Sequence, residues 1–154
     1  NNDSEAKVRF KMKKTRIKFT EGKFQNKVEM KLNPQPIWYI NFDAGASSAN
    51  IDLSKFKIME ANFDMGAASM DLKLGSPLEE TKVSIDAGAS SITIRIPEGA
   101  ASEIRVDAAL SSKSFDGFEK INSELYRTAN FNDSVNKFII TIDSGVSSID
   151  VTRY

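Results

Sequence analysis

A six-residue motif that begins with aspartate recurs along the chain and limits the folds that the chain can adopt. The motif reads DAGASS at residues 43–48 and 86–91, DMGAAS at 64–69, DAALSS at 107–112 and DSGVSS at 143–148. Successive aspartates are separated by 21, 22, 21 and 36 residues, and the last interval equals one period of 21 plus 15 inserted residues. A fixed period of this length is typical of a protein that stacks one small structural unit.

Apolar residues flank each motif with a period of two. In the copy at Asp86 they stand three and one positions before the aspartate, at Val83 and Ile85, and eight positions after it, at Ile94. Such alternation predicts strands with one buried face. The inward-facing parity changes across the motif, so we expect a bend with an extra residue at the Gly-Ala-Ser-Ser step. Each unit is therefore predicted to consist of strand, bend, strand and turn.

The stacked units predict an all-β, single-domain β-solenoid that resembles a right-handed β-helix, with about five rungs of 21–22 residues. We assign the rungs to residues 37–154 and expect equivalent side chains, such as Phe42, Phe63 and Ile85, to lie directly above one another. Residues 1–36 are predicted to form a basic capping segment, in which a strand pair covers the first rung. A leucine-rich repeat lacks support because its Leu-x-x-Leu-x-Leu core is missing, and a propeller blade would need about twice the period.

The composition excludes several kinds of chemistry. The chain has no histidine and no cysteine, which removes the usual general base, the commonest metal ligand and thiol catalysis. Its formal net charge is +0, which offers nucleic acid no overall attraction. The sequence SKFK at 54–57 matches Ser-x-x-Lys, but the companion motifs of acyl-transfer enzymes are missing. We therefore expect a protein that is not an enzyme and that needs no cofactor, metal or nucleic-acid partner.

Three stretches make the chain similar to a known family. INFDAGASSANIDL at 40–53, VSIDAGASSITIRI at 83–96 and IITIDSGVSSIDVTRY at 139–154 resemble the C-terminal domain of LiaF-like cell wall-active antibiotics response proteins. They also resemble the related putative-adhesin β-solenoids, the toast-rack domains. YRTANFNDSVNKFIITIDSGVSSIDV at 126–151 is similar to the ending of that family, where an Asn-aromatic-Asp segment leads into the last rung.

This resemblance implies a location and a role. Such domains are held at the bacterial envelope by upstream transmembrane or lipid-anchored segments, and they sense or regulate envelope stress without established catalysis. We therefore expect a non-catalytic scaffold, sensor or regulator that binds a protein or a cell-wall polymer. Its location would be extracytoplasmic, with membrane anchoring through a segment that is missing from this chain.

The repeated motif itself has three interpretations. In the first, it is a structural turn ladder, in which aspartate accepts backbone hydrogen bonds, glycine allows a positive φ or a close backbone approach, and serine hydroxyls stack. In the second, a column of aspartates spaced about 4.8 Å apart binds calcium, as in a calcium-binding adhesin-like domain. In the third, carboxylate pairs serve a carbohydrate-active β-helix. The ladder residues are Asp43, Asp64, Asp86, Asp107, Asp143, Gly45, Gly66, Gly88, Gly145, Ser48, Ser69, Ser91, Ser112 and Ser148.

A second candidate surface is the basic N-terminal stretch KVRFKMKKTRIKF at 7–19. Residues 1–31 hold ten Lys or Arg and only four acidic residues, and the cations alternate with Val8, Phe10 and Met12. The alternation predicts a strand whose lysines protect an open sheet edge against aggregation. The same row of cations could also bind an anionic membrane surface or cell-wall polymer. The candidate contacts are Lys7, Arg9, Lys11, Lys13 and Lys14.

The insertion at residues 116–136 is the third candidate surface. It contains Phe118, Leu125, Tyr126 and Phe131 among polar residues. Insertions in repeat proteins emerge on one face and are often binding elements, so these four residues are candidates for partner binding. The alternative is a loop that folds back and covers the last rungs.

Overall fold

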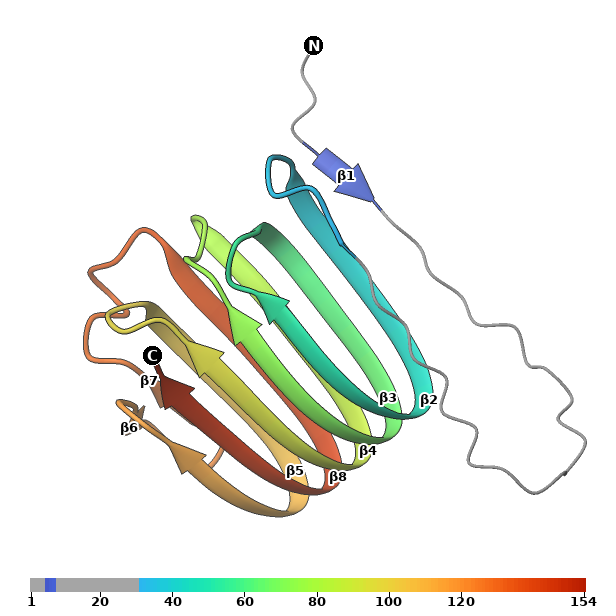
Figure 1. Cartoon of the computed structure of the whole chain (residues 1–154). Helices are drawn as coiled ribbons and strands as arrows, with labels where there is room; N and C mark the ends of the chain where they lie inside the picture. Colours follow the sequence, from blue (N-terminus) through green and yellow to red (C-terminus); the bar gives the residue numbers. More distant parts are fainter. Residues whose placement is uncertain (1–4, 8–30) are drawn as a thin grey trace, which may run out of the picture.

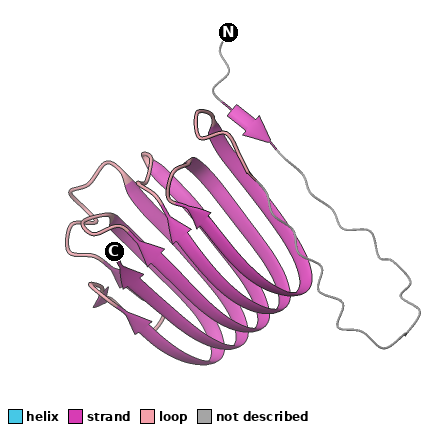
Figure 2. Ribbon diagram, in the orientation of Figure 1, coloured by secondary structure: helices cyan, strands magenta, loops and turns pink. Residues whose placement is uncertain are grey.

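The structure, a computed structural model, describes residues 5–7 and 31–154, and in this part of the chain it is built from strands without any helix (Figure 2). Consequently, no helix among these residues is long and apolar enough to cross a membrane. The five long strands are β2 (Ile37–Leu53), β3 (Lys57–Leu74), β4 (Glu80–Ile96), β5 (Ala101–Phe115) and β8 (Lys137–Arg153). The short strands are β1 (Glu5–Lys7), β6 (Glu119–Lys120) and β7 (Leu125–Arg127). The predicted all-β class is confirmed.

Each long strand bends back on itself, so that its two halves face each other, and the bent strands stack side by side (Figure 1). The bends line one edge of the stack, and the connecting turns lie on the opposite edge. Neighbouring long strands pair in parallel with equivalent residues in register, and Phe63 lies between Phe42 and Ile85 as predicted. The fold is therefore a β-solenoid-like stack of rungs.

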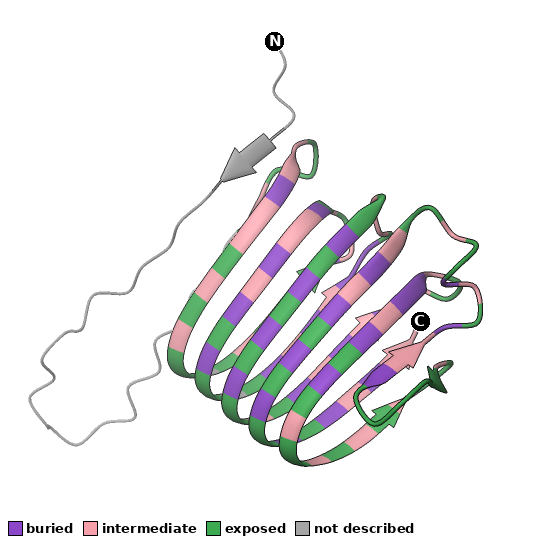
Figure 3. Ribbon diagram, turned by 180° about the vertical axis from the view of Figure 1, so that it is seen from behind, coloured by how far each residue is buried: buried purple, intermediate pink, exposed green. Residues whose placement is uncertain are grey.

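The predicted change of parity occurs at the bend. In β4 the buried residues before the bend include Val83, Ile85 and Ala87, whereas those after it are Ile92, Ile94 and Ile96. Two consecutive residues, Gly88 and Ala89, face outward between these two sets. Figure 3 shows the resulting alternation of buried and exposed positions along the halves of the long strands that face the viewer.

The order of the rungs differs from their order in the chain. The sheet runs β1-β2-β3-β4-β8-β5-β7-β6, so the C-terminal strand β8 lies between β4 and β5. Ile85 therefore pairs with Ile142 rather than with Val106, the next equivalent residue in the sequence. The sheet is also mixed, because β7 pairs antiparallel with both β5 and β6.

A charged residue explains why β5 lies at the end of the long rungs. Lys113 of β5 is aligned with Ile149 of β8, and the equivalent residues Met70, Ile92 and Ile149 of the inner rungs are all fully buried. An unpaired ammonium group in that position would lose its hydration at a high cost in free energy. At the end of the stack Lys113 stays half-buried.

The core is fully buried in the middle of the stack and less complete at the β2 end. Val83 and Ile85 of β4 are fully buried, whereas the equivalent Ile40 and Phe42 of β2 are only half-buried. Strand β1 pairs in parallel with the first three residues of β2. Residues 1–4 and 8–30 of the predicted capping segment, including its candidate cations Arg9, Lys11, Lys13 and Lys14, fall outside the described residues.

Candidate functional site

The five motifs lie together on the outer surface of the bends, which we call the bend ridge. It is formed by the outward-facing aspartate, glycine and serine positions of the motifs, all of which are exposed. In spatial order the aspartates are Asp43, Asp64, Asp86, Asp143 and Asp107, and the serines are Ser48, Ser69, Ser91, Ser148 and Ser112. Parallel strands place each row of equivalent residues at a spacing of about 4.8 Å.

The glycines of the ridge are needed for close packing between rungs. A Cβ atom built on Gly66 would lie 2.6 Å from the carbonyl oxygen of Gly45, and one on Gly88 would lie 2.7 Å from that of Gly66. The same distance separates a Cβ on Gly145 from the carbonyl oxygen of Gly88. Among the described residues, a positive φ occurs only at Gly99 and Gly117, so Gly66, Gly88 and Gly145 serve close backbone approach and not a left-handed turn.

The polar groups of the ridge are mostly free of partners within the described part of the chain. The hydroxyl of Ser112 donates to that of Ser148 at 3.2 Å, as expected for a serine ladder. Among the described residues, no backbone N–H group donates to the carboxylate of any of the five motif aspartates, although the turn-ladder interpretation predicts such hydrogen bonds. In the same residues, no group of three or more acidic side chains surrounds a point that could hold a metal ion. The ridge therefore presents carboxylates outward and does not enclose them.

An apolar row runs along the ridge between the glycine and serine rows. Its members in spatial order are Ala46, Ala67, Ala89, Val146 and Leu110. The largest two are neighbours at the β5 end, where Val146 is 58% exposed and Leu110 is 70% exposed. The sequence analysis missed this row, although the fourth residue of the motif already changes from Ala to Val or Leu in these two copies.

The aromatic residues of the insertion face the β5 end of the core. Leu125 and Phe131 are buried, and the ring of Tyr126 lies 4.6 Å from that of Phe115 in an edge-to-face arrangement. The ring of Phe118 lies 6.3 Å from that of Phe115. These positions correspond to the alternative of a loop that covers the last rungs, and they leave little of the four candidate side chains available to a partner. The exposed apolar residues in this region are Ile121 and Val135.

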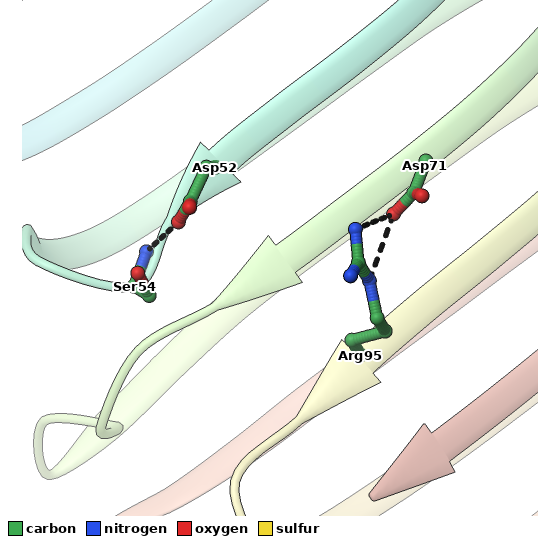
Figure 4. Close-up of polar contacts among 4 residues, drawn as sticks. All are labelled: Asp52, Ser54, Asp71 and Arg95. Carbon is green, nitrogen blue, oxygen red and sulfur yellow. Dashed lines mark hydrogen bonds and ion pairs between the residues drawn. The ribbon is translucent and has the colours of Figure 1, made fainter. Parts of the chain in front are cut away.

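Polar contacts near the turn edge occur both between neighbouring rungs and within one rung. The guanidinium of Arg95 on β4 donates to Asp71 on β3 at 2.7 and 3.0 Å (Figure 4). The backbone N–H of Ser54 donates to the carboxylate of Asp52 at 2.9 Å where β2 ends, and the Ser54 hydrogen bonds lower the pKa of Asp52. Both contacts are partly exposed, so we assign them a local role in ordering the turns.

A shallow hollow of about 420 Å³ lies at the turn edge, and its walls come from three turns and the end of β8. Arg153 in its wall donates to the backbone carbonyls of Ala100 at 2.9 Å and Pro97 at 3.3 Å. Its guanidinium lies 4.8 Å from the centre of the Phe118 ring, and burial lowers the pKa of Arg153. Because these contacts join separate turns, we assign Arg153 a structural role.

The stacked rungs, the Gly-containing bends and the strand-only architecture define a domain of the toast-rack class. Residues 1–95 match the family described as the N-terminal domain of toast_rack (DUF2154). This match spans more than half of the chain, and the chain belongs to the toast-rack family, as its resemblance implied.

One solved structure supports the same fold. It is a putative cell adhesion protein from Clostridium sporogenes ATCC 15579, with a TM-score of 0.70 and 22% sequence identity. The similarity covers 80% of this chain and 58% of that protein, so the chain spans little more than half of its length. The comparison with curated proteins produced no match.

Proposed function

We propose that this chain is a non-catalytic module of the bacterial cell envelope that binds a protein or a cell-wall polymer through the bend ridge. In this proposal it acts as a scaffold, sensor or regulator in the envelope-stress response and is held on the outer side of the membrane. The observation that carries the proposal is the register of the ridge, in which carboxylate, apolar and hydroxyl rows repeat from rung to rung.

A repeating surface suits an extended ligand. Equivalent groups about 4.8 Å apart can make the same contact several times with a polymer or an extended peptide, and several weak contacts then add up to useful affinity. The exposed aspartates favour neutral or cationic groups on the ligand over anionic ones. The exposed Val146 and Leu110 add apolar area at one end of the ridge.

Two comparisons support an envelope role. The toast-rack family includes this chain, and the similar solved structure carries the name of a cell adhesion protein. Adhesion needs a surface for binding and no chemistry, which agrees with a chain that lacks histidine and cysteine.

Co-sedimentation with purified peptidoglycan sacculi tests the polymer part of the proposal. The ridge variant Asp86→Asn/Asp143→Asn removes two carboxylates from adjacent rungs without changing their shape. The control Glu80→Gln/Asp150→Asn removes the same charge from the same two strands, away from the bends. We expect the wild type and the control to sediment, and the ridge variant to sediment at least several-fold less.

The outcomes separate the possibilities. Equal sedimentation of all three proteins would contradict binding through the ridge, and no sedimentation of the wild type would leave a protein as the partner. Release of soluble sugar fragments by the wild type, lost in the ridge variant, would instead favour the carbohydrate-active alternative.

A further inference from the structure

The inner side of the bend carries buried serines on β4 and β8 within an otherwise apolar core. The residues that stand one and four positions after the aspartate of β8 are Ser144 and Ser147, and they are only 4% and 8% exposed. Ser90 of β4 lies beside Ser147 in the parallel register. Three serines on two adjacent rungs therefore point away from solvent.

The hydroxyl oxygens of Ser90, Ser144 and Ser147 are buried and have no hydrogen-bond partner among the described residues. A buried hydroxyl without a partner is costly, and most native proteins avoid it. Elsewhere this chain follows that rule: the hydroxyl of Thr81, also buried, donates to the carbonyl oxygen of Ile58 at 2.9 Å. The bend serines therefore lack the kind of protein partner that Thr81 has.

Their neighbours are small side chains, and the row of serines continues to the last long rung. Ala87 and Ala108 occupy the positions equivalent to Ser144 in the rungs on either side of β8, so the neighbouring side chains are small. Ser111 of β5 continues the row of Ser90 and Ser147, and it is half-buried in the last long rung. In the described part of the chain, β7 covers only Glu103 to Arg105 of β5, so the outer side of β5 at Ser111 is left unpaired by any strand.

We propose that the inner side of the bend binds ordered water molecules that bridge Ser90, Ser144 and Ser147 and that exchange with solvent past Ser111. Water suits this site because it donates and accepts hydrogen bonds and is small enough to enter between the serine and alanine side chains. The fully buried Met65 stands at the equivalent position of β3 and limits the site to β4, β8 and β5.

A crystal structure at about 1.5 Å resolution or better tests the proposal directly. We expect at least one ordered water within hydrogen-bond distance of two of the three serine hydroxyls. A dry bend, or serine rotamers that donate to backbone carbonyls without water, would overturn the proposal.

Thermal unfolding of matched serine variants gives a second test, in which the direction of the change in melting temperature decides the outcome. If water bridges the hydroxyls, Ser144→Ala and Ser147→Ala remove a hydrogen-bond partner, and the melting temperature falls by about 2–4 °C each. The outward-facing Ser91→Ala on the adjacent strand β4 serves as the control and should change the melting temperature much less. A rise in melting temperature for Ser144→Ala and Ser147→Ala would mean that the hydroxyls had no partner, and it would refute the proposal.

Discussion

Replacement of Gly88 by alanine tests whether close contact between rungs governs the bend ridge. The added Cβ atom would lie 2.7 Å from the carbonyl oxygen of Gly66, which is 0.7 Å closer than the 3.4 Å at which ordinary contacts begin. Gly45 offers a matched control, because a Cβ atom built there meets no atom of the described residues within 4 Å. The two substitutions are chemically identical and occupy equivalent positions, so only the neighbouring rung distinguishes them.

The expected magnitudes follow from that difference. The neighbour of Gly88 is backbone in a paired strand, and it cannot move by 0.7 Å without stretching the hydrogen bonds between rungs. Overpacking of this kind costs about 1–3 kcal/mol of unfolding free energy. In contrast, Gly45→Ala meets no described atom and has no positive φ to strain, so the reduced entropy of the unfolded chain should raise the unfolding free energy by about 0.4–1 kcal/mol.

Urea unfolding followed by circular dichroism measures both effects as shifts of the transition midpoint. We expect Gly88→Ala to unfold at a lower urea concentration than the wild type, and Gly45→Ala at the same or a higher concentration. If the two variants shifted the midpoint equally, steric contact between rungs would not be the reason for the glycine row. Local backbone preference would then explain the glycines instead.

Two further predictions concern the ends of the chain. The Tyr154 hydroxyl donates to the Leu74 carbonyl at 2.6 Å, so Tyr154→Phe should lower the unfolding free energy by about 0.5–1.5 kcal/mol in urea titrations. Burial raises the pKa of Tyr154, so the contribution of this tyrosine to the unfolding free energy is complete below pH 10 and is lost as the pH rises further. The Tyr154→Phe variant should not show this loss at high pH. If the predicted capping segment continues the register of β1, Arg9→Cys should form a disulfide with Asn41→Cys and not with Asp43→Cys, as non-reducing electrophoresis would show.

Much of the rung could be predicted because its information is local. The alternation of apolar and polar residues around Ile85 and Ile94, with the change of parity between them, predicts which side chains face inward. The repeated glycine marks the bend, and the period sets the rung length. The role of that glycine stayed open, because a positive φ and a close approach demand the same residue. Only the position of Gly66 above Gly45 decides between them.

The candidate surfaces were harder to predict, because exposure depends on what packs nearby. The apolar and aromatic candidates of the insertion looked available to a partner, yet Leu125 and Phe131 are buried and Tyr126 packs on Phe115. In contrast, Val146 and Leu110 are apolar but exposed, because the bend directs two consecutive residues outward. A strand period alone cannot reveal either outcome.

The sequence by itself determined the repeating unit, since side-chain alternation and the glycine bend act within some twenty residues. The tertiary structure alone decided which rungs are neighbours. All five long rungs carry nearly the same inward pattern, so each could pair with any other in register. The choice depends on contacts between distant residues: Lys113 stays hydrated only in an end rung, and β8 therefore fills the place between β4 and β5.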